Sequence, residues 1–161
     1  MTHQAIYAGS FDPITNGHLD IIQRALNIFD QVVVGVIENI DKTPLFTMEE
    51  RIDLIKNSIR SEHVIVEGFQ GLLVDYARQK NIFKLIRGLR AVSDFEYEFQ
   101  MSLTNRDQDP RIDTIFLMTD QSYSYLSSSI VRQLAKLNGN IEGYVTPYVA
   151  SQLKEKYHGK N

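Results

Sequence analysis

The sequence contains no cysteine and no tryptophan, and only 4 of its 161 residues are proline. Without cysteine the chain has no disulfides, no thiolate metal ligands and no cysteine nucleophile. No apolar run approaches the roughly 20 residues that a membrane-spanning helix needs. The first residues, Met1-Thr2-His3-Gln4, lack the basic segment of a signal peptide. We therefore expect a cytoplasmic protein with no membrane partner.

The remaining composition is typical of a soluble globular protein. Hydrophobic residues make up 43% and charged residues 23%, which excludes the disordered and low-complexity classes. The 17 basic and 20 acidic residues give a net charge of −3. This charge argues against a broad basic face, so we expect no nucleic-acid partner. The length fits one domain spanning residues 1–161.

Short apolar segments alternate with amphipathic helical patterns along the chain. We predict strands over residues 4–8, 32–37, 64–66, 84–86 and 114–118. The predicted helices begin at Gly17, Thr47, Leu72, Ser93, the Ser127–Ser129 run and Pro147. Capping boxes are expected at Thr47–Glu50 and at Ser93–Glu96, the second opening a helix with Phe95, Phe99 and Leu103 on one side. The alternation predicts an α/β, Rossmann-like, doubly wound five-stranded parallel sheet with C-terminal helices.

Ligands of such sheets bind beyond the carboxyl ends of the strands, so the residues that follow each strand matter most. Gly9 to His18 follow the first strand. Gly9 allows close backbone approach, Ser10 offers a hydroxyl, and His18 lies in the first turn of a helix, where free N–H groups attract phosphate. A lone histidine would be interpreted as a surface residue. The combination instead favours an anion site.

Three further strand ends carry groups that suit phosphate. Lys42 follows the second strand, although a single loop lysine is usually only solvated. Arg87-Gly88-Leu89-Arg90 follow the fourth strand, and guanidinium groups match phosphate oxygens. Either arginine alone could instead pair with Asp94 or Glu96. The hydroxyl-rich segment 121–129 precedes a helix and forms another candidate anion cradle.

Several other chemistries have no signature in the chain. The four histidines are scattered, so a structural zinc site is not expected. The Gly-x-Ser-x-Gly pattern of α/β-hydrolases does not occur. No catalytic carboxylate pair stands out, because Asp12 precedes Pro13 and shapes a turn, and Glu98 lies on a helix as an exposed residue by default.

Two short motifs and two longer stretches carry a resemblance to a known family. Thr15–His18 resemble the T/HxGH signature of the nucleotidyltransferase superfamily, and Ser127–Arg132 resemble its ISSTxxR motif. Tyr7–His18 and Ile86–Glu98 resemble the bacterial phosphopantetheine adenylyltransferases, and the similarity covers essentially the whole chain. Ala8 stands where that family usually has proline.

The resemblance implies transfer of AMP from ATP to 4′-phosphopantetheine, giving dephospho-coenzyme A and pyrophosphate by direct attack without a covalent intermediate. It implies catalytic roles for His18 and Lys42, and acceptor binding by Ser10, Lys42, Leu73 and Arg87. It assigns ATP to Ser10, Phe11, His18, Gly88, Leu89, Arg90, Glu98, Tyr123, Ser124, Tyr125, Leu126, Ser127, Ser128 and Ser129. It also implies Mg²⁺ delivered with ATP, a homohexamer, and feedback inhibition by coenzyme A.

The chemistry of the residues agrees with this reaction. A phosphate monoester has a second pKa of about 6, so the nucleophile is already anionic and needs no general base. Alignment and charge stabilisation can then supply the catalysis. Two alternatives stay open: a related enzyme with another acceptor or nucleotide (a cytidylyltransferase, or an adenylyltransferase for nicotinamide mononucleotide), and a non-catalytic nucleotide sensor. The apolar start of the helix at Leu72–Val74 weakly favours an acceptor with a long apolar arm.

Overall fold

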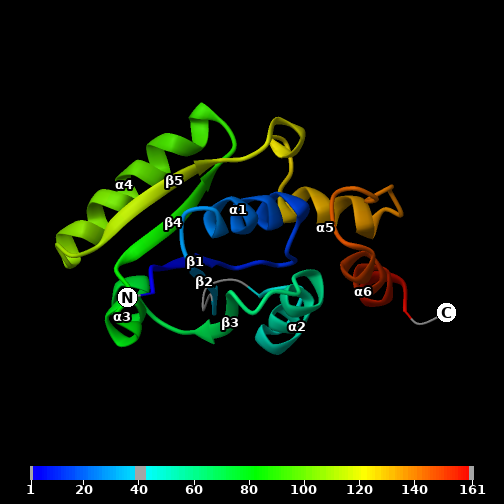
Figure 1. Cartoon of the computed structure of the whole chain (residues 1–161). Helices are drawn as coiled ribbons and strands as arrows, with labels where there is room; N and C mark the ends of the chain where they lie inside the picture. The colour runs from blue at the N-terminus through cyan, green and yellow to red at the C-terminus, as the bar shows by residue number, and fades with distance from the viewer. Residues whose placement is uncertain (1, 39–42, 160–161) are drawn as a thin grey trace.

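A computed structural model describes residues 2–38 and 43–159. The strands are β1 (Gln4–Gly9), β2 (Gln31–Ile37), β3 (Val64–Phe69), β4 (Lys84–Leu89) and β5 (Asp113–Met118). The helices are α1 (Asn16–Leu26), α2 (Met48–Ser58), α3 (Leu73–Lys80), α4 (Val92–Gln108), α5 (Ser128–Lys136) and α6 (Pro147–His158), with a short 3₁₀ turn η1 (Gln121–Tyr123). All strand pairs are parallel, in the order β3-β2-β1-β4-β5 (Figure 1). The predicted fold class is confirmed.

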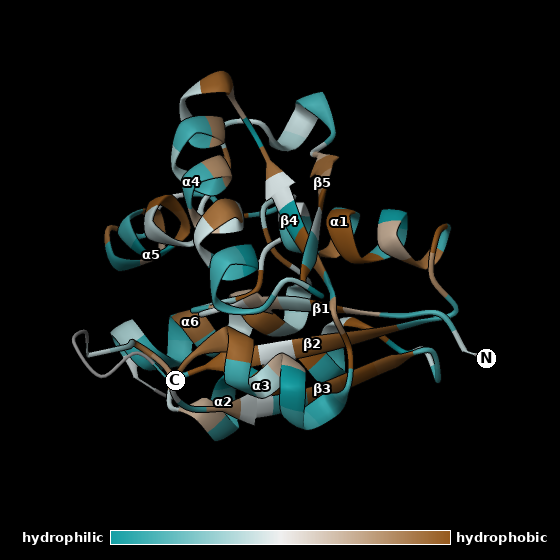
Figure 2. Ribbon diagram, turned by 90° about the vertical axis from the view of Figure 1, so that its left-hand side faces the viewer, coloured by the Kyte–Doolittle hydropathy of each residue, from teal (hydrophilic) through white to brown (hydrophobic). Residues whose placement is uncertain are grey.

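The sheet is covered on both faces, which explains why its central strands are almost wholly apolar (Figure 2). Alternate residues of β1 enter two different cores. Ala5 and Tyr7 face a core shared with α1, α2, α5 and α6, whereas Ile6 and Ala8 face a core shared with α3. Helices far apart in the sequence, α1 and α6 among them, therefore contribute to one hydrophobic layer.

The two neighbours of the central strand β1 are paired with it over different lengths. β1 and β2 stay paired as far as Gly9 and Val36, but β1 and β4 pair only at Ile6–Leu85 and Tyr7–Ile86. Because consecutive crossovers leave β1 in opposite directions across the sheet, the carboxyl ends of β1 and β4 form the switch point of the fold. The sequence predicted a ligand site at this edge.

The two predicted capping boxes have different outcomes. At α2 the box is present: the Thr47 hydroxyl accepts from the Glu50 N–H at 3.2 Å, and the Glu50 carboxylate accepts from the Thr47 N–H at 2.8 Å. At α4 the prediction is wrong, because the helix begins at Val92 with Ala91 as an N-cap that has no side-chain bond. β4 continues to Leu89, three residues beyond the predicted end, so the connection is short and Ser93 lies inside the first turn.

Helix α4 keeps an uncovered apolar side. Phe95, Phe99 and Leu103 are 44%, 48% and 50% exposed, and no residue of α4 is buried in the part of the chain described. In Figure 1 the helix lies along β5, at the end of the sheet away from β3. Among the residues that the structure describes, no helix is both long and apolar enough to cross a membrane.

Candidate active site

A pocket of about 440 Å³ opens at the switch point. Five segments that are far apart in the sequence line it. They are the end of β1 with the following turn (residues 7–12), the start of α1 (Thr15, Gly17, His18 and Ile21), the stretch before α2 with its buried arginine (Thr43, Pro44 and Arg51), the end of β4 (Arg87, Gly88 and Arg90), and Thr119 with the entry to α5 (residues 126–129 and Arg132). The predicted convergence of strand ends around one cavity is therefore present.

His18 is held in one tautomer by the start of its own helix. Thr15 is the N-cap of α1, and its backbone N–H donates to Nδ1 of His18 at 3.0 Å. Because a backbone N–H can only donate, Nδ1 is the acceptor and the ring proton lies on Nε2. Burial, with the nearby charges of Arg90 and Arg87, lowers the pKa of His18 to about 4. At neutral pH this residue is an uncharged donor through Nε2.

Aromatic packing fixes the plane of the imidazole. The ring of Phe11 meets the His18 ring edge-on, with centroids 5.1 Å apart, and Tyr7 packs against Phe11 at 5.3 Å. Phe11 has φ 48°, a left-handed conformation that a bulky residue adopts only under constraint. Its ring also lies over Gly9, where an added Cβ would come within 3.2 Å of the ring. The absence of a side chain at Gly9 thus makes room for the Phe11 ring, and Gly9 also lines the pocket.

The helix N-termini keep only some of their N–H groups free. At α1 the N–H of Asn16 donates to the Tyr144 carbonyl at 2.8 Å, and that of His18 faces the Thr15 hydroxyl. Gly17 supplies the remaining first-turn donor, and it lines the pocket. At α5 the Ser127 hydroxyl caps the N–H of Ile130.

Ser128 and Ser129 follow Ser127 at the start of α5. A hydroxyl group here bonds to the protein backbone, whereas the backbone amides lie at the pocket. The Ser128 hydroxyl donates to the Pro13 carbonyl at 2.7 Å. The first-turn N–H groups of Ser128 and Ser129 have no intrahelical acceptor, and both residues line the cavity. The donors that α5 offers an anion are therefore backbone amides more than hydroxyls.

Both predicted arginines reach the pocket, and each has an acidic partner. Arg87 pairs through two hydrogen bonds with Glu98, at 2.6 and 2.7 Å, and its third contact is the Ala8 carbonyl at 3.0 Å. Burial would lower the pKa of Arg87, but the Glu98 carboxylate raises it overall. Arg90 pairs with Asp94 at 3.2 Å and donates to the Leu126 carbonyl at 3.0 Å. The pairing of Arg90 with Asp94 was the alternative weighed from the sequence.

Other predicted site residues lie elsewhere or outside the description. Lys42 lies outside the described residues. Leu73 begins α3 and packs against the core on the opposite face of the sheet. Leu89, Glu98, Tyr123, Ser124 and Tyr125 are not among the residues that line the pocket. Of these, Glu98 is one side chain away, through Arg87.

Sequence comparison decides the family. Residues 6–134 match the cytidylyltransferase-like family model. A phosphopantetheine adenylyltransferase of Dictyoglomus turgidum is 53% identical over 98% of this chain and 99% of its own length. The chain belongs to the phosphopantetheine adenylyltransferase family.

A second curated relative supports the same family, and one solved structure shares the fold. The enzyme of Geotalea daltonii is 55% identical over 96% of both chains. A putative nicotinate-nucleotide adenylyltransferase of Vibrio parahaemolyticus has the same fold, with a TM-score of 0.71 at 18% identity over 100% of this chain and 98% of its own. The chain is thus a nucleotidyltransferase, as its motifs indicated.

Two pocket residues were missed or given no role from the sequence. Arg132, part of the quoted second motif, contacts the carbonyl of Asp12 and lies 3.7 Å from its carboxylate. Arg51 lies on α2 and is only 2% exposed. A charged residue one turn before the apolar pair Leu54–Ile55, on the buried side of a helix, is the signal that could have found it.

The carboxylates near the pocket are committed to protein contacts. Asp12 accepts from the N–H groups of Leu45 and Phe46 at 2.8 and 3.0 Å, which supports its predicted structural role. Within the described ranges, no group of three histidine or acidic side chains is arranged to hold a metal ion.

Proposed function

We propose that this pocket transfers AMP from ATP to the phosphate of 4′-phosphopantetheine by direct in-line displacement. One observation supports the mechanism. Four uncharged N–H donors converge at the switch point: His18 Nε2 and the backbone amides of Gly17, Ser128 and Ser129. An oxygen of the acceptor phosphate forms a bond to the α-phosphorus, and the bond from that phosphorus to the bridging oxygen breaks. Pyrophosphate leaves, and dephospho-coenzyme A remains.

In this proposal His18 stabilises the transition state. Its Nε2–H donates to a non-bridging oxygen of the α-phosphate, where negative charge accumulates as the nucleophile approaches. A neutral donor suits this role, since the ring loses no proton and stays at full strength across the neutral pH range. The capping hydrogen bond from Thr15 sets the direction of the donor before substrate arrives.

The remaining roles follow the resemblance together with the geometry. Ser10 and Lys42 bind the acceptor phosphate, and Arg87 holds the pantetheine arm. The role of Leu73 at that arm rests on the resemblance alone, because Leu73 does not line the pocket. The ATP residues are Phe11, Gly88, Leu89, Arg90, Glu98 and the segment Tyr123–Ser129. Because Glu98 and Arg87 are paired in the structure, residues given to two different substrates are bonded to each other. Mg²⁺ would arrive with ATP, held mainly by the phosphates, and would lower the charge on the triphosphate.

Pyrophosphate release is the experiment that tests this function. The purified protein is assayed with ATP, CTP and other nucleotides against 4′-phosphopantetheine, nicotinamide mononucleotide and other phosphorylated acceptors. We expect release with ATP and 4′-phosphopantetheine, together with dephospho-coenzyme A detected by mass spectrometry. Release with a different acceptor would identify a sister activity. ATP binding without release in any combination would identify a sensor.

The proposal extends to assembly and control. The uncovered side of α4, with Phe95, Phe99 and Leu103, supplies an apolar surface for contact between copies, consistent with the homohexamer that the resemblance implies. Coenzyme A contains the acceptor arm of the product, so it would compete at the same pocket as a feedback inhibitor. The cytoplasm, where ATP is available, is the compartment that this reaction requires.

A further inference from the structure

Arg51 is a buried cation at the edge of the pocket. It is 2% exposed, yet it lines the cavity between Ser10 and Thr43. No carboxylate in the described part of the chain lies within ion-pair distance of its guanidinium, which donates to three backbone carbonyls. A buried guanidinium without an acidic partner is costly to maintain. A residue that only filled core space would not need this charge.

The three carbonyls that Arg51 contacts belong to three different segments. Nη1 donates to the carbonyls of Ser10, at 2.8 Å, and Ile37, at 3.0 Å. Nε donates to the carbonyl of Thr47 at 3.4 Å. Ser10 follows β1, Ile37 ends β2, and Thr47 is the N-cap of α2. In the sequence, Ile37 and Thr47 are the two ends of the stretch that carries Lys42.

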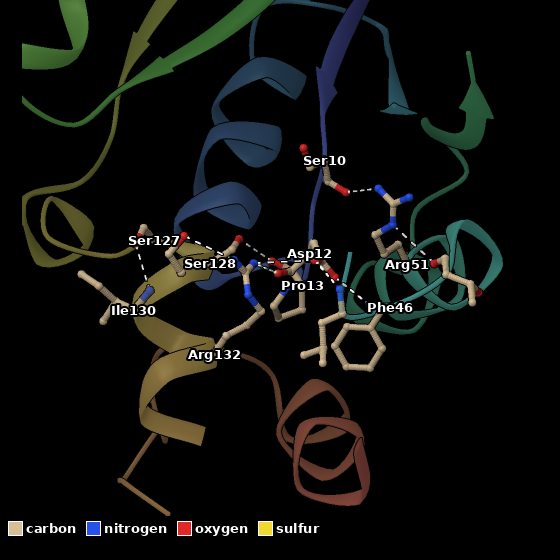
Figure 3. A network of polar contacts seen from close by, with 12 residues as sticks. Ser10, Asp12, Pro13, Phe46, Arg51, Ser127, Ser128, Ile130 and Arg132 are labelled. Atoms are coloured by element: carbon tan, nitrogen blue, oxygen red, sulfur yellow. Dashed lines mark hydrogen bonds and ion pairs between the residues drawn. The ribbon is translucent and has the colours of Figure 1, made fainter. Parts of the chain in front are cut away.

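The turn after Ser10 is held from a second direction as well (Figure 3). Arg132 of α5 contacts the carbonyl of Asp12, whose carboxylate accepts from the N–H groups of Leu45 and Phe46. Phe11 lies between these two anchors with a positive φ. A constrained backbone of this kind persists only where the surroundings determine it. Arg51 and Arg132 thus fix opposite ends of one strained turn.

We infer that Arg51 is a positioning residue for the phosphate of the acceptor. By holding the Ser10 carbonyl, it fixes the backbone that presents the exposed Ser10 hydroxyl. By holding the carbonyls of Ile37 and Thr47, it keeps the end of β2 and the start of α2 beside that turn. The inference rests on the proposed function, which gives Ser10 to that phosphate. Arg51 acts through Ser10 and makes no substrate contact of its own.

Paired binding measurements test the inference without relying on turnover. Calorimetry gives the affinity for 4′-phosphopantetheine and for pantetheine, which lacks the phosphate, so the ratio of the two affinities isolates the contribution of the phosphate. We expect Arg51→Met to lower that ratio roughly 10- to 100-fold, the scale of one or two charge-assisted hydrogen bonds. Affinity for pantetheine itself should change little.

Two further variants separate positioning from general damage. Leu54→Val loosens a buried contact of the same helix and should leave the ratio unchanged. Arg51→Lys keeps the charge but loses the planar fork that spans three carbonyls, so its ratio should fall at least about threefold. Circular dichroism checks the folding of each protein. If Arg51→Met does not fold, the affinity ratio measured for Arg51→Lys tests the inference on its own.

The outcomes distinguish this inference from the proposed function. A wild-type ratio near one would mean that the pocket does not recognise the phosphate, which would contradict the proposed acceptor and this inference with it. A large wild-type ratio that persists in both Arg51 variants would overturn the inference alone. An equal fall in Leu54→Val would show that Arg51 serves the packing of α2, and would also overturn it.

Discussion

His18 shows how one residue can carry both local structure and chemistry. Its Nδ1 completes the capping box of α1 with Thr15, in the position usually taken by glutamate or glutamine. The same bond leaves Nε2 as a donor directed away from the cap. The sequence predicted a histidine donor at a helix start. The tautomer follows from the local bond to the Thr15 N–H, whereas the neutral state comes from burial in the folded protein, with the charges of Arg90 and Arg87 adding to it.

Replacing His18 should separate catalysis from folding. We expect His18→Ala and His18→Asn to lower kcat by roughly 10²–10³, the effect of losing one preorganised donor, with a much smaller change in KM for ATP. The asparagine amide oxygen can still accept from the Thr15 N–H, so α1 remains capped. Steady-state pyrophosphate release measures the effect, and His63→Asn, a change at an exposed histidine, is the control. Near-normal turnover in both His18 variants would remove His18 from the mechanism.

The lowered pKa of His18 also predicts how stability depends on pH. The unfolded histidine titrates near 6.5 and the folded one near 4, so between these values the unfolded state binds more protons and stability falls as pH falls. From pH 7 to pH 5 this group should remove roughly 1–2 kcal/mol of unfolding free energy. Urea unfolding at both pH values measures it. His18→Asn should lose less stability than wild type and His63→Asn; identical losses in all three would contradict the lowered pKa.

At the scale of the element, local signals determined most helix starts and failed where a neighbouring strand ended late. Thr47 caps α2 as its spacing predicts, because the box needs only two residues three positions apart. Ser93 has an equally good pattern but lies two residues after the N-cap Ala91. Pairing with β5 carries β4 on to Leu89, so only Arg90 and Ala91 separate the strand from the helix. The pairing of β4 with β5 depends on residues that are distant in the sequence, so a local pattern does not predict where the strand ends.

Helix α4 presents the opposite case, in which the pattern is correct but none of the described residues buries its apolar side. Phe95 stacks near Phe99, with centroids 5.6 Å apart, and meets Phe116 of β5 at 5.9 Å. Much of the apolar side remains exposed. An amphipathic pattern predicts that one side of a helix is buried. It does not predict whether the same chain or another protein surface buries it.

At the scale of the whole molecule, this exposed face predicts self-association. We expect light scattering to give a particle of six chains, and Phe99→Glu to shift it to smaller species, since a buried carboxylate at a contact between copies is unfavourable. Leu137→Glu, a matched change at a residue 72% exposed beyond α5, should leave the mass unchanged. A wild-type particle with the mass of one chain would contradict the proposed assembly.

The sequence by itself determined the alternation of strands and helices, the fold class, and the motifs that end at His18 and begin at Ser127. These depend on local periodicity and on residues adjacent in the chain. Only the tertiary structure decided which donors remain free, that Arg87 and Arg90 have acidic partners, and that Arg51 joins three segments through their carbonyls. Hydrogen bonds and charges act through space, so they exist only once the crossovers have brought the strand ends to one edge.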